Sequence, residues 1–124
     1  MGKRILIVED EKDMADVIRQ LLEREGYHID IAYDGEEGLE KIKATMPDLV
    51  LLDVMLPKLD GRDLLKIVKN DKDLMGIPIL MVSARSEQWD RELGLELGAE
   101  EYVEKPLDSA RLLRKISNIF TKKR

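Results

Sequence analysis

The run Leu49-Val-Leu-Leu52 constrains the fold of this chain most, because it is short, continuously apolar and followed directly by Asp53. A run of this length that is apolar at every position is typical of a strand buried on both faces of a parallel sheet. Such sheets carry functional residues at the carboxyl ends of their strands, so Asp53 is the first candidate site residue. A lone acid at a strand end is more often simply solvated, and the rest of the chain must decide between the two.

The other segments alternate between strand and helix patterns. Apolar runs at residues 4–8 and 77–82 predict two further central strands, whereas the alternating segment 27–33 and the polar-flanked segment 101–104 predict edge strands. Five helices are predicted. The first carries the apolar stripe Met14, Val17, Ile18, Leu21 and Leu22 and stops at Gly26, and the second runs from the capping residue Asp34 to about Thr45. The third opens at Asp60-Gly61, the fourth runs from about Ser86 to Leu97 and closes at Gly98, and the fifth is capped at its start by Asp108. Five strands alternating with five helices predict an α/β fold, a doubly wound parallel sheet of order 2-1-3-4-5 with helices on both faces.

Composition limits the classes of function. The 124 residues suffice for one domain, 1–124, and the net charge of −5 argues against a nucleic-acid-binding surface. The chain has no cysteine, which excludes disulfides and thiolate metal sites. No apolar run is long enough to span a membrane, so we expect no membrane association and a cytoplasmic location.

Polar side chains stand at the carboxyl ends of four predicted strands: Glu9 and Asp10, Asp53, Ser83, and Lys105. The predicted strand order makes the first and third strands neighbours, so three carboxylates converge. Because their charges repel, one would take up a proton unless a cation is present, and Mg²⁺ suits such an oxygen-rich site. A carboxylate, a metal, a hydroxyl and an ammonium together suit the transfer of a phosphoryl group onto the carboxylate.

Four stretches carry a family resemblance: Val8-Glu-Asp-Glu11, Leu52-Asp-Val-Met-Leu-Pro57 with Gly61, Val82-Ser-Ala84, and Gly98-Ala-Glu-Glu-Tyr-Val-Glu-Lys-Pro106. In these stretches, and over essentially its whole length, the chain resembles the receiver domains of two-component response regulators. The resemblance implies that Asp53 is a phosphoacceptor, served by the phosphohistidine of a histidine kinase or by a phosphotransfer protein in a phosphorelay.

The resemblance also implies roles for the other site residues. Glu9, Asp10, Asp53 and the backbone carbonyl of Met55 would bind Mg²⁺ or Mn²⁺, Lys105 would pair with the phosphoryl group, Ser83 would turn its hydroxyl onto it, and Tyr102 would turn inward as a switch. The bond between Lys105 and Pro106 would be cis. Leu107 departs from the family, which most often has Phe after Lys-Pro.

The predicted helix 86–97 is less regular, with Trp89 and Leu93 on one stripe. We hypothesise that these two side chains belong to a partner or homodimer surface formed by this helix, the strand 101–104 and the C-terminal helix. Packing of Trp89 in the core is the alternative.

Other functions share parts of this pattern. A flavodoxin-type electron carrier has the same topology, but Glu9-Asp-Glu11 would repel the phosphate of a flavin. An aspartate-nucleophile phosphatase would need a second acid where Met55 stands. A phosphorylation-independent binding module is a third alternative. We expect a signalling switch that catalyses only its own phosphorylation and dephosphorylation and is not a conventional enzyme.

Overall fold

The computed structural model describes residues 2–84 and 94–122, which form strands and helices in alternation. The elements are β1 (Arg4–Val8), α1 (Lys12–Glu23), β2 (His28–Ala32), α2 (Gly35–Thr45), β3 (Leu49–Asp53), α3 (Gly61–Lys69), β4 (Ile79–Ala84), β5 (Glu101–Lys105) and α5 (Ser109–Thr121). Residues 94–96 are also helical, and they lie within the predicted helix 86–97. Trp89 and Leu93 lie outside the described residues, so the hypothesis about them is not tested.

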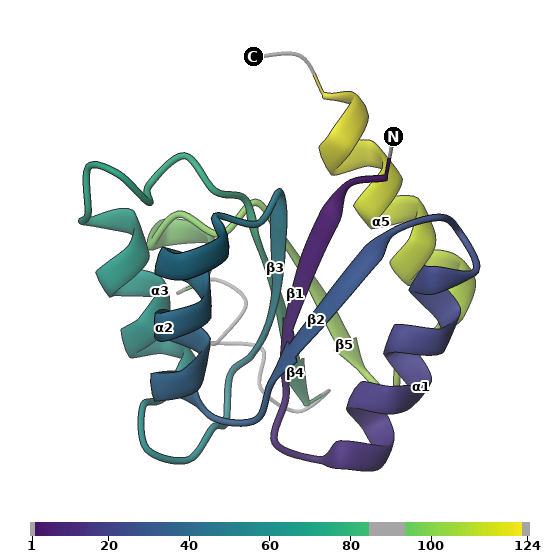
Figure 1. Cartoon of the computed structure of the whole chain (residues 1–124), viewed down its shortest axis with the longest axis horizontal. Coiled ribbons are helices and arrows are strands. Elements are labelled where there is room, and N and C mark those ends of the chain that lie inside the picture. Colours follow the sequence, from purple (N-terminus) through teal and green to yellow (C-terminus); the bar gives the residue numbers. More distant parts are fainter. Residues whose placement is uncertain (1, 85–93, 123–124) are drawn as a thin grey trace.

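The five strands form one parallel sheet of order β2-β1-β3-β4-β5, which confirms the predicted topology. β1 pairs with β3 so that Val8 lies opposite Leu52, and the residues that follow these two emerge together at one edge of the sheet. Helices α2 and α3 cover one face of the sheet, and α1 and α5 cover the other (Figure 1). β2 and β5 are the edge strands, as their sequences predict.

Two apolar clusters, one on each face of the sheet, form the core. All five residues of β3 are buried, in agreement with its unbroken apolar run. Leu52 belongs to the cluster beneath α2 and α3, and Leu51 belongs to the cluster beneath α1 and α5. The alternation of side chains along each strand thus divides the core in two, with the sheet between the halves.

Three acids cap helices as their positions predict. The side chains of Asp34, Asp60 and Asp108 accept hydrogen bonds from the backbone N–H groups of Glu37, Arg62 and Arg111 respectively. Gly26 and Gly98, predicted to end helices, both have positive φ angles, of 92° and 111°. The sequence signals for helix boundaries are therefore realised closely.

Two local predictions were wrong. Val17 of the predicted stripe is 64% exposed, whereas Ala15, which lies outside that stripe, is fully buried. The other four residues of the stripe are buried in the core cluster beneath α1 and α5 or pack against it: Met14, Ile18, Leu21 and Leu22. β4 is shifted by two residues from the predicted run 77–82, so that Ser83 lies inside the strand.

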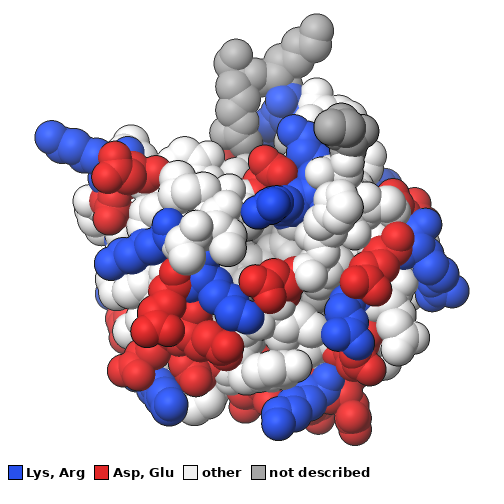
Figure 2. All heavy atoms as spheres, viewed as in Figure 1, with Lys and Arg blue, Asp and Glu red and all other residues white. Residues whose placement is uncertain are grey.

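Charged side chains of both signs are interspersed over the face shown in Figure 2, which forms no continuous basic patch. Among the described helices, none is both long enough and apolar enough to cross a bilayer.

Candidate functional site

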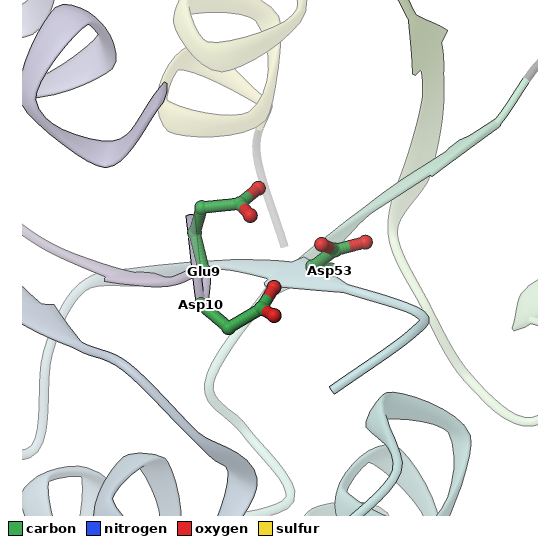
Figure 3. A group of neighbouring side chains, drawn as sticks. All are labelled: Glu9, Asp10 and Asp53. Carbon is green, nitrogen blue, oxygen red and sulfur yellow. The ribbon is translucent and has the colours of Figure 1, made fainter. Parts of the chain in front are cut away.

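Three carboxylates meet where β1 and β3 end. Glu9 and Asp10 follow β1 directly, and Asp53 is the last residue of β3. Each of the three offers an oxygen atom, and these oxygens all lie within 4.8 Å of one another. Figure 3 shows Glu9 and Asp10 extending from the end of β1 toward Asp53. The predicted convergence of the three acids is therefore present in the fold.

Burial makes this cluster electrostatically unfavourable. Glu9 and Asp53 are 3% and 5% exposed, whereas Asp10 is open to solvent. Burial, followed by the charge of Asp53, raises the pKa of Glu9 from 4.5 to about 6. Burial also raises the pKa of Asp53, although Lys105 and a backbone hydrogen bond from Met55 act in the opposite direction. The site thus holds more negative charge than its own cation balances, which is the setting for a bound metal.

Lys105 reaches the two buried carboxylates from the end of β5. Its Nζ donates to Asp53 Oδ2 at 3.0 Å and lies 3.3 Å from Glu9 Oε1. Burial lowers the pKa of Lys105, but the hydrogen bond and charge of Asp53 and the charge of Glu9 outweigh it, so that the pKa is raised. The ammonium is therefore fixed against the carboxylate that we expect to react. The sequence did not predict the contact between Lys105 and Glu9, because it indicated Glu9 only as a metal ligand.

Ser83 is buried at 2% exposure beside the end of β3. Its Oγ has no hydrogen-bond partner among the residues that the structure describes. Because a buried hydroxyl without a partner is costly, such a group requires an explanation, and a ligand oxygen is one.

Tyr102 is buried at 6% exposure in the core cluster beneath α2 and α3. It lies opposite Met81 in the pairing of β4 with β5, and Ser83 comes two residues after Met81. The alternation of strand side chains therefore places Ser83 and Tyr102 on the same face of the sheet. The side chain of Tyr102 is thus buried in this structure, and its role as a switch stays a prediction.

Met55 and Pro106, which the family resemblance also assigns, have defined positions. Met55 lies two residues after Asp53, with its side chain 62% exposed and its backbone next to the Asp53 carboxylate. The peptide bond between Lys105 and Pro106 is cis. Gly35 was not named, although it lies against the loop after Asp53; its signal in the sequence is a glycine directly after a helix-capping acid, where a better helix former is expected.

Comparison with known proteins agrees with this geometry. The family described as "Response regulator receiver domain" matches residues 5–117. The alkaline phosphatase synthesis transcriptional regulatory protein PhoP of Bacillus subtilis (strain 168) is 43% identical over 120 residues, which are 97% of this chain and 49% of PhoP. The transcriptional regulatory protein DltR of Streptococcus agalactiae serotype III (strain NEM316) is 45% identical over 113 residues, 91% of this chain and 50% of DltR. This chain spans about half the length of these two relatives.

Solved structures give the same result. A putative response regulator from Chloroflexus aurantiacus J-10-fl superposes with a TM-score of 0.94 at 33% identity, covering 98% of this chain and 100% of that one. The receiver domain of a sensor histidine kinase from Pseudomonas aeruginosa PAO1 superposes with a TM-score of 0.86 at 30% identity, covering 95% and 97%. The latter structure has a magnesium ion coordinated in its active site cleft.

Proposed function

This chain belongs to the family of response regulator receiver domains, which act in two-component signalling, and on this premise we propose that Asp53 is its phosphoacceptor. The phosphoryl group would come from the phosphohistidine of a histidine kinase or from a phosphotransfer protein. Residues 1–124 would act as a single receiver domain. The one observation that carries the proposal is the buried Asp53 carboxylate, held by Lys105 at 3.0 Å inside an acidic cluster.

The proposed reaction uses this arrangement directly. An oxygen of Asp53 forms a bond to phosphorus while the bond between phosphorus and the donor nitrogen breaks, and the electron pair of that bond returns to the imidazole. Lys105 keeps Asp53 in place and supplies positive charge where the phosphoryl oxygens would lie. The aspartyl phosphate stays on the chain, so the domain would catalyse only its own phosphorylation and dephosphorylation.

Mg²⁺, or Mn²⁺ in its place, fits the acidic cluster. Both ions prefer oxygen ligands, and Glu9, Asp10 and Asp53 offer carboxylate oxygens within 4.8 Å of one another. The backbone carbonyl of Met55 would be a further ligand. When bound, the ion would neutralise negative charge on the transferring group. The raised pKa of Glu9 supports this assignment, because a second positive charge is what the cluster lacks.

Phosphorylation would affect partner binding by shifting the domain toward one of two conformations. The Ser83 Oγ, which has no partner among the described residues, would donate to a phosphoryl oxygen, and Tyr102 on the same sheet face would be held inward. The surface changed in this way would comprise β5, α5 and the predicted helix 86–97, and it would bind an output domain, a partner or a second copy of the chain. Direct binding of nucleic acid by this domain is not expected, and a cytoplasmic location remains a prediction.

One experiment tests the proposal. The purified chain is treated with a small phosphodonor and Mg²⁺, and its intact mass is followed over time. We expect a single phosphoryl adduct that is absent without Mg²⁺ and absent in Asp53→Asn. An adduct that persists in Asp53→Asn would refute the assigned acceptor, and no adduct in the wild-type chain would favour the phosphorylation-independent binding module.

A further inference from the structure

We propose that Gly35, in the first turn of α2, is a positioning residue for the metal site, because it determines where the loop between β3 and α3 lies. This inference rests on the proposed function, in which the carbonyl of Met55 binds the metal. The loop comprises residues 54–60 and leads from Asp53 to the start of α3.

The first turn of α2 and this loop are in direct backbone contact. The N–H of Gly35 donates to the carbonyl of Pro57 at 3.2 Å. A Cβ added at Gly35 would lie 1.9 Å from the Leu59 carbonyl oxygen and 2.7 Å from the Leu59 carbonyl carbon. These are backbone atoms, so no side-chain rotation can make room. Gly35 does not have a positive φ angle, and alanine is the better helix former, so space and not backbone conformation requires glycine here.

The helix side of this contact is rigid. Asp34 accepts from the N–H of Glu37 at 2.8 Å, and the Glu37 side chain accepts from the N–H of Tyr33 at 2.7 Å. These two bonds, which resemble a capping box, secure the first turn of α2 in addition to its own hydrogen-bond ladder. An added methyl group at Gly35 therefore meets a helix end that does not yield easily.

The loop side is anchored at its two ends, because the N–H of Val54 donates to the Val82 carbonyl at 3.0 Å and the N–H of Gly61 donates to the Val54 carbonyl at 2.9 Å. Between these ends, Lys58 has a φ angle of 68°. The residues on either side of it are joined by a hydrogen bond of 2.7 Å from the Leu59 N–H to the Pro57 carbonyl, which makes this a strained γ-turn. A displacement imposed at Leu59 would therefore be taken up by residues 55–59, which include Met55.

The consequence for the metal follows from coordination chemistry. Mg²⁺ requires a near-ideal octahedron with short bonds, whereas Ca²⁺ accepts longer bonds and irregular geometry. A displaced carbonyl at Met55 would be a poor Mg²⁺ ligand but would still serve Ca²⁺. A general loss of stability would weaken both ions alike, so the ratio of the two affinities separates positioning from folding.

The test compares Gly35→Ala with Gly76→Ala, at which an added Cβ meets no atom within 4 Å. Dissociation constants for Mg²⁺ and Ca²⁺ are measured by titration on protein shown to be folded by circular dichroism. We expect Gly35→Ala to raise the Mg²⁺ constant about tenfold, the low end of the usual loss when a supporting group around a metal is removed. The Ca²⁺ constant should rise less, and Gly76→Ala should leave both unchanged. An unchanged Mg²⁺ constant in Gly35→Ala, or an equal loss of both ions, would overturn the positioning role.

A second measurement on the wild-type chain covers the case in which Gly35→Ala does not fold. In an NMR titration with Mg²⁺, the amide signals of Gly35 and Met55 should move with the same dissociation constant, while that of Gly76 stays in place. A stationary Gly35 signal together with a moving Met55 signal would refute the coupling but leave the metal site intact. If the wild-type chain binds no Mg²⁺ at all, the proposed metal site fails and the positioning role fails with it.

Discussion

Replacing Glu9 by Gln should stabilise the fold at neutral pH in the absence of metal. Glutamine keeps the size of the side chain and an acceptor for the N–H of Glu11, which donates to Glu9 Oε2 at 3.1 Å, but it removes a buried charge. The pKa of Glu9 is raised to about 6 in the fold, from 4.5. That rise already includes the favourable charge of Lys105, so it measures a net cost of ionising Glu9 in place.

The magnitude and sign follow from proton linkage. A tenfold change in proton affinity corresponds to about 1.4 kcal/mol, so the raised pKa corresponds to about 2 kcal/mol of stability. Because the pKa is higher in the folded state, this contribution is present below pH 4.5 and is lost as the pH rises through 6. Wild type should therefore lose about 2 kcal/mol relative to Glu9→Gln between pH 4 and pH 7.5.

The assay is urea unfolding of both chains at pH 4 and pH 7.5, because the difference between the two pH values cancels packing effects of the substitution. Glu11→Gln, which removes an exposed acid from the same loop, serves as the control. Mg²⁺ at ten times its dissociation constant should stabilise wild type by about 1.4 kcal/mol at pH 7.5, and Glu9→Gln far less. The reasoning is refuted by either of two results. In the first, the difference in unfolding free energy between wild type and Glu9→Gln is the same at pH 4 and pH 7.5. In the second, Glu11→Gln shows as large a pH-dependent difference from wild type as Glu9→Gln does.

Three further substitutions test separate parts of the structure. Lys105→Met should slow phosphorylation of Asp53 by a small phosphodonor, as followed by intact mass, and an unchanged rate would contradict the role of the ammonium. The same substitution should raise the pKa of Asp53 further, as followed by NMR. Ser83→Ala should keep or raise the urea midpoint, because it removes a buried hydroxyl that has no partner among the described residues, yet it should reduce the phosphorylation-dependent chemical-shift changes. Asp108→Ala should cost about 1 kcal/mol in urea unfolding, because it removes the cap on the N–H of Arg111; a loss near zero would show that solvent caps α5 equally well.

Much of the fold could be predicted because its signals are local. Unbroken apolar runs mark strands with helices on both faces, and the run ending at Leu52 identified β3 as central. Acids before helices mark their starts. The site followed from topology, because adjacent parallel strands deliver Glu9, Asp10 and Asp53 to one place.

The remaining features depend on contacts between distant segments. Periodicity identified an apolar stripe on α1, but it could not tell that Ala15 is buried in the core while Val17 is exposed. The close approach of Gly35 to Leu59 likewise joins the start of a helix to a loop, two segments that share no sequence pattern. Such features require the packed structure, because burial and close contact are properties of pairs of elements.

The position of Lys105 on the last strand has a consequence for the order in which the chain is made. During synthesis the acids of β1 and β3 emerge first, and the ammonium that contacts Asp53 follows 52 residues later. A nascent chain that ends before β5 therefore carries buried acids without their counter-charge and β4 as an open edge. Completion of β5 pairs the open side of β4 and brings Lys105 to the acids, so the last strand extends the sheet and partly neutralises the site in the same step.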